Sequence, residues 1–153
     1  MLPGLKAVLN IHPMLVHFPI ALWLAALLFE AWAVIRTSED WHRTAARLLY
    51  LGTFAGILTV LSGLAAEKSV PAGQAMIVVG IHKTLMILTT SLALGLSLFA
   101  LAFRKNFTAA YRKYLLVGLV AMAILMTVGG DRGAQLIYQY GAAVDWSTAQ
   151  QQK

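Results

Sequence analysis

The side chains best suited to chemistry in this 153-residue chain are its histidines. His12 and His17 lie in the string HPMLVHFP, where the first long apolar stretch begins, and His82 lies near the start of the third. His42 belongs instead to a polar connection. A histidine inside a membrane span costs free energy unless it is partnered, and is therefore a candidate functional residue. At 1.5 Å of rise per residue, we expect His17 and His82 at matched depth, roughly 5–10 Å below one membrane surface.

Two imidazoles at one depth suit a haem site. Histidine nitrogens are axial ligands of haem iron, and a bis-imidazole centre is suited to electron transfer. We therefore predict that His17 and His82 are the metal ligands of a haem b held between the first and third helices. His12 is a further cofactor-binding candidate, and whether His12 or His17 supplies the ligand from the first helix stays open. Because the sequence contains no cysteine, thiolate metal sites and iron–sulfur clusters are excluded.

Small residues near these histidines would admit a flat cofactor. Gly52, Gly56 and Gly63 recur at helical spacing along one stripe of the second apolar stretch. Gly129 and Gly130 end the fourth stretch at the expected depth of the histidines. A stripe of small residues equally well accepts a neighbouring helix at close approach, and this alternative stays open.

Charged residues within or beside the apolar stretches have two expected roles. Lys83 follows His82 directly and Arg132 follows the glycine pair, so both are suited to bind the negative propionates of a haem. Glu30 is the only carboxylate inside a predicted span. For Glu30 we expect an ion pair with Arg43 or Arg47, and a proton relay is the functional alternative.

Three other interpretations of the histidines stay open. They can join helices through hydrogen bonds to one another or to main-chain carbonyls, as in a structural or assembly subunit without a cofactor. They can bind copper, together with Met14 or Met76. They can also bond a quinone carbonyl in a pocket lined by Trp23 or Tyr138.

The elements that must position these residues are membrane helices. Hydrophobic residues make up 59% of the chain and charged residues 12%, against roughly 25% charged residues in a soluble domain. Four stretches reach the ~20 apolar residues that cross a bilayer, at about 14–35, 46–66, 76–103 and 113–130. The sequence therefore predicts one all-α domain, an integral membrane four-helix bundle with short loops. An interfacial segment is expected at 131–146.

The basic net charge of +6 is interpreted as membrane topology, because the chain has no basic run and no nucleic-acid motif. Seven of the twelve Lys and Arg residues fall in the first and third loops, which the positive-inside rule places in the cytoplasm. Both termini and the three clustered histidines are then predicted on the periplasmic side of a bacterial inner membrane. The sequence leaves open whether copies of the chain form a homo-oligomer.

The string HPMLVHFPIAL, the early His82 and the ending GG followed by YQYGAAV resemble the bacterial four-helix membrane family catalogued as domain of unknown function number 2231. The resemblance covers nearly the whole chain. Some members are fused to, or encoded beside, Rieske or cytochrome c domains, which implies redox work at the periplasmic face. Because these 153 residues include no such domain, the resemblance implies a separate partner of that kind. We therefore predict an electron-transfer membrane cytochrome rather than a catalyst acting alone.

Overall fold

The structure, a computed structural model, describes residues 11–67, 70, 73–105 and 108–142. In this part of the chain all regular structure is helical. The elements are α2 (His12–Leu15), α3 (His17–Arg36), α4 (Glu39–Ala66), α5 (Gln74–Ala102) and α6 (Ala109–Tyr138). Four helical stretches are long and apolar enough to cross a membrane, with α2 and α3 counted together as one. The predicted all-α membrane four-helix bundle is confirmed.

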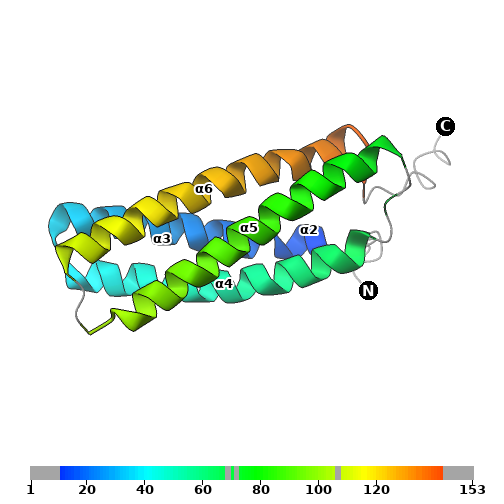
Figure 1. The fold of residues 1–153 in the computed structure, drawn as a ribbon. Coiled ribbons are helices and arrows are strands. Elements are labelled where there is room, and N and C mark those ends of the chain that lie inside the picture. Colours follow the sequence, from blue (N-terminus) through cyan, green and yellow to red (C-terminus); the bar gives the residue numbers. More distant parts are fainter. Residues whose placement is uncertain (1–10, 68–69, 71–72, 106–107, 143–153) are drawn as a thin grey trace, which may run out of the picture.

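The four long helices form a closed ring of neighbours (Figure 1). In that ring α3 packs against α4, α4 against α5, α5 against α6, and α6 against α3. The α3–α4 and α5–α6 connections lie at one end of the bundle, called here the hairpin end. At the other end, called the α2 end, α2 lies beside α4 near the start of α5 and the end of α6. Each end therefore brings together residues far apart in the sequence.

Helix α4 begins at Glu39, earlier than the predicted start near residue 46. Thr37 adopts a left-handed conformation with φ 51°, which ends α3, and Ser38 is extended and precedes the first turn of α4. Glu39 and Asp40 occupy that turn, where negative charge is stabilised by the helix dipole. The polar residues before 46 thus belong to the helix, and His42 is a helical residue.

Helix α6 continues to Tyr138, through the Gly129–Gly130 pair that was expected to end it. Gly129 is buried, and a Cβ at this position would collide with the side chains of Leu85 and Met86 from α5. Glycine at this position therefore allows α5 to pack closely on α6, and it does not end α6. Residues 131–138 of the expected interfacial segment are helical, and 143–146 lie outside the described residues.

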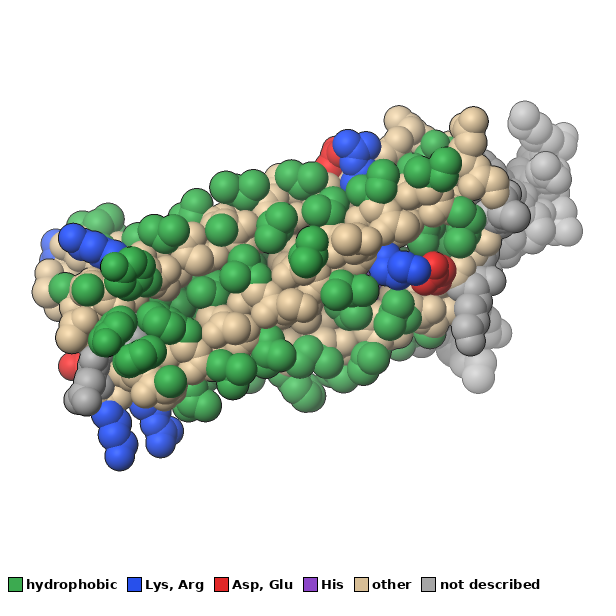
Figure 2. Space-filling model, in the orientation of Figure 1, with side chains coloured by type: hydrophobic (Ala, Val, Ile, Leu, Met, Phe, Trp, Pro, Cys, Tyr) green, Lys and Arg blue, Asp and Glu red, His purple; other side chains and the backbone are tan. Residues whose placement is uncertain are grey.

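The buried side chains form two clusters of unequal size. The larger fills the middle and the hairpin half of the bundle and includes Trp23, Leu49, Leu96, Leu119 and Met122. The smaller cluster consists of Val78, Val79 and Leu136 and lies towards the α2 end. Hydrophobic side chains also cover the outside of the helices over most of their length (Figure 2), as expected for a lipid-facing surface.

Candidate functional site

His12 is held against α4 at the α2 end. Its Nδ1–H donates to the main-chain carbonyl of Thr59 at 3.1 Å and lies 3.0 Å from Ser62 Oγ. A Cβ on Gly63 would come within 2.9 Å of the imidazole Cε1. Glycine at 63 is therefore what allows the imidazole ring to lie flat against α4.

His82 repeats this arrangement on the opposite pair of helices. Its Nδ1–H donates to the main-chain carbonyl of Gly129 on α6 at 2.7 Å. Its ring lies against Gly133, where an added Cβ would be 3.0 Å from Cε1. The predicted site residue Gly129 thus contacts His82 through its carbonyl oxygen, whereas a Cβ on Gly130 would meet nothing within 4 Å.

The structure buries His12 and His82 in part and leaves His17 on the surface. His12 and His82 are half-buried near the same end of the bundle, whereas His17 is exposed on α3. Because a carbonyl can only accept, Nδ1 carries the proton in both His12 and His82, which leaves Nε2 as the nitrogen with the lone pair. This tautomer, fixed by a main-chain carbonyl, is the one found in metal-binding histidines.

The glycine stripe of α4 is filled by planar side chains of the protein itself. A Cβ on Gly52 would lie 2.6 Å from Trp23 Cδ1, and one on Gly56 would lie 2.7 Å from the far edge of the same indole. Gly63 receives the His12 ring. Trp23, which was expected to line a quinone pocket, is buried in the core. Close helix packing, the alternative given for this stripe, therefore explains Gly56 and Gly63.

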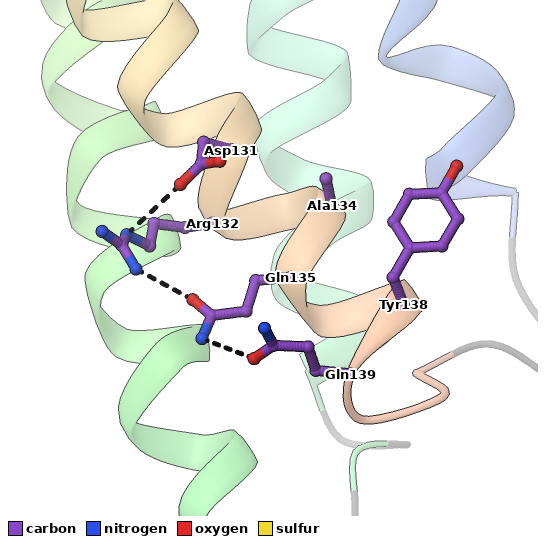
Figure 3. Close-up of a pocket in the computed structure, with 6 residues that line it drawn as sticks. All are labelled: Asp131, Arg132, Ala134, Gln135, Tyr138 and Gln139. Carbon is purple, nitrogen blue, oxygen red and sulfur yellow. Dashed lines mark hydrogen bonds and ion pairs between the residues drawn. The ribbon is translucent and has the colours of Figure 1, made fainter.

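Both residues predicted to bind propionates have partners in the protein. Lys83 Nζ donates to the two carboxylate oxygens of Glu67 at 2.6 and 2.9 Å. Arg132 donates to Gln135 at 2.9 Å and lies 3.9 Å from the Asp131 carboxylate, along the polar face of α6 drawn in Figure 3. A propionate would have to replace these partners. The sequence does not indicate Glu67 as the partner of Lys83, because the connection between α4 and α5 separates the two residues along the chain.

A family model described as predicted membrane protein (DUF2231) matches residues 8–146. The chain belongs to the DUF2231 family. The matched range contains all four long helices and both His12 and His82. No curated protein and no solved structure matches the chain.

This DUF2231 chain contains a second polar centre, at the hairpin end. A hydrogen bond of 2.7 Å joins Glu30 Oε2 on α3 and His42 Nδ1 on α4. The expected pairing of Glu30 with Arg43 or Arg47 is wrong, because Glu30 bonds His42, Arg43 pairs with Glu39 on the surface, and Arg47 is exposed. Glu30 thus reaches the buried histidine of α4.

The DUF2231 chain presents no larger group of metal-binding side chains among its described residues: no three of His, Cys, Asp and Glu converge. A metal centre that used His12 and His82 would therefore draw no third ligand of these types from the described residues. A tetrapyrrole supplies four nitrogen ligands of its own, and so needs only two from the protein.

Proposed function

We propose that the chain is a membrane electron-transfer protein that binds haem b through His12 and His82. The observation that carries the proposal is the matched state of the two imidazoles. They come from α2 and α5, and each donates Nδ1–H to a carbonyl of a neighbouring helix. In each ring this tautomer puts the lone pair on Nε2, and a carbonyl bonded to the other ring nitrogen is typical of metal-binding histidines. His82 keeps its predicted role, and His12 replaces His17 as the ligand from the first span.

The donor set fits a bis-imidazole haem, and the glycine stripe does not contribute to the fit. Trp23 and His12 themselves occupy the space beside Gly56 and Gly63, so we assign the macrocycle no place there. When bound, haem b supplies a one-electron carrier. The chain's own part is to fix the orientation and basicity of each imidazole through the carbonyls of Thr59 and Gly129.

Optical spectra of the full chain expressed with added haem test this assignment. We expect a low-spin Soret spectrum in the unmodified protein and its loss or conversion to high spin in His12→Ala and His82→Ala. His17→Ala and His42→Ala are the matched controls and should keep the spectrum. A protein without a Soret band contradicts the proposal, and normal spectra in both ligand variants contradict the choice of ligands.

The same hydrogen bonds favour a second candidate function, in which the histidines only join helices within a structural or assembly subunit. His12 links α2 to α4, and His82 links α5 to α6. His82→Asn separates the two roles, because an asparagine amide can donate from nearly the same place as Nδ1 but is not a haem ligand. If haem binding is the function, His82→Asn keeps its thermal stability and loses the Soret band. Copper or a quinone bound by the same imidazoles would give no Soret band.

The proposal extends to the side of the membrane. Lys and Arg gather mainly at the hairpin end (Figure 2), which favours that end as cytoplasmic and the α2 end as periplasmic in a bacterial inner membrane. A periplasmic cytochrome c or Rieske protein is then the proposed redox partner. A reporter that is active only outside the cytoplasm, fused after Lys153, should be active; activity only when it is fused near Lys105 would reverse the orientation.

A further inference from the structure

The haem proposal makes no use of the most deeply buried charged group described in the chain. The Glu30 side chain is 0% exposed and that of His42 is 6% exposed, and their hydrogen bond is 2.7 Å long. Glu30 Oε1, the second carboxylate oxygen, has no hydrogen-bond partner among the described residues. A buried carboxylate with one unpaired oxygen is costly in a membrane bundle and calls for a functional explanation.

We propose that Glu30 and His42 form a proton-binding site at the hairpin end of the bundle. Between them the two groups share one proton, and the pair is neutral overall whether that proton lies on the carboxylate or on the imidazole. Removing the proton leaves a buried negative charge, and adding a second leaves a positive one. The site thus takes up or releases a single proton, and no other bond changes.

Charged residues lie at the hairpin end on or beside all four long helices. They are Arg36 of α3, Glu39, Asp40, Arg43 and Arg47 of α4, Arg112 and Lys113 of α6, and Arg104 and Lys105 directly after α5. Glu39 is neutralised by Arg43 at 2.9 Å. Arg112 Nε is buried without a hydrogen-bond partner among the described residues. The hairpin end therefore carries a surplus of positive charge.

The proton comes from, and returns to, water at the hairpin end. His42 is three residues from the start of α4, about 4.5 Å along the helix axis. Towards the α2 end the next buried residues of α4 are Ala45, Ala46, Leu49 and Gly52. The next buried hydroxyl on α4, Thr53, lies roughly 16 Å farther along the axis and bonds Ser97 at 2.9 Å. An apolar layer therefore separates the site from the α2 end.

The site is independent of the proposed haem, which lies at the other end of the bundle. Infrared difference spectra of the cofactor-free protein between about pH 5 and pH 8 provide the test. We expect the unmodified protein to show a carboxylic C=O band that changes with pH and is lost in Glu30→Gln. The band should persist in Glu67→Gln, which is the control because Glu67 is a partly exposed carboxylate paired with Lys83. In oriented proteoliposomes the band should respond to a pH step on the hairpin side and not to one on the α2 side.

Several results would overturn the proposal. A Glu30 carboxylic band that stays constant over this pH range shows a permanently protonated carboxyl, and the absence of the band at every pH shows a fixed ion pair; both contradict the proposal. An equal response to pH on both sides contradicts access from the hairpin end alone. If Glu30→Gln does not fold, nitrogen NMR of ¹⁵N-histidine in the unmodified protein gives the answer, with signals assigned through His12→Ala, His17→Ala and His82→Ala. The His42 signals should then shift with pH, and constant His42 signals would reject the site.

Discussion

The two ends of the bundle use histidine in opposite ways. At the hairpin end His42 bonds a carboxylate at 2.7 Å and is buried. At the α2 end His82 bonds a main-chain carbonyl at the same distance and is only half-buried. A carboxylate can exchange a proton with imidazole, whereas a main-chain carbonyl only accepts a hydrogen bond from it, so the partner decides the chemistry. The first arrangement suits proton binding, and the second prepares Nε2 for a metal.

The two ends also differ in the number of buried hydrophobic side chains. The larger hydrophobic cluster surrounds the hairpin half, and only three buried hydrophobic residues form the separate cluster at the α2 end. The Glu30–His42 hydrogen bond at the hairpin end is therefore shielded from water, and the half-buried polar bonds at the α2 end compete with it. We expect equivalent substitutions to cost more at the hairpin end.

The largest effect is expected for Glu30→Ala. Removing one partner of a buried ion pair leaves the other uncompensated, which typically costs about 3–5 kcal/mol. The free energy of unfolding in detergent micelles measures this loss. The double variant Glu30→Met with His42→Leu should recover most of it, because an apolar pair of similar volume fills the same space. A double variant as unstable as Glu30→Ala would mean that packing, not the charge, explains the cost.

A smaller loss is expected for Gly56→Ala, in the middle of the bundle between the two ends. The added Cβ would meet the Trp23 indole at 2.7 Å, and overpacking of a tight contact costs about 1–3 kcal/mol. Gly95→Ala is the matched control, because a Cβ there meets nothing within 4 Å and alanine favours the helix by up to ~1 kcal/mol. Equal unfolding free energies for the two variants would show that Trp23 moves aside freely.

The sequence predicts the four spans well because bilayer thickness dictates their length. It does not predict which histidine faces inwards. His12 and His17 are five residues apart, about 140° around an ideal helix, so only one of them can face the bundle interior. Val16, between α2 and α3, keeps right-handed helical dihedrals, so α2 and α3 form one span, with His12 held against α4 and His17 exposed. No pattern of residue types in the string HPMLVHFP specifies that rotation.

The partner of Glu30 was missed for a related reason. His42 and Arg43 are adjacent, about 100° apart on α4, and charge alone favours the arginine. The helix begins at Glu39, and its rotation points His42 into the bundle and leaves Arg43 on the surface with Glu39. Burial, which depends on packing between helices, thus selected the weaker base as the partner.

The smallest effect is expected at the α2 end, where the Lys83–Glu67 ion pair offers a direct contrast with the buried pair. Its atoms are as close, at 2.6 Å, but the side chains are 37% and 25% exposed. Water screens the charges, so Lys83→Gln should change the free energy of unfolding by only about 0–1 kcal/mol. Glu67→Gln is the reciprocal control, and both single variants should resemble the double variant. A loss comparable to that of Glu30→Ala would show that the α2 end is as well shielded as the hairpin end, and the contrast drawn between the two would fail.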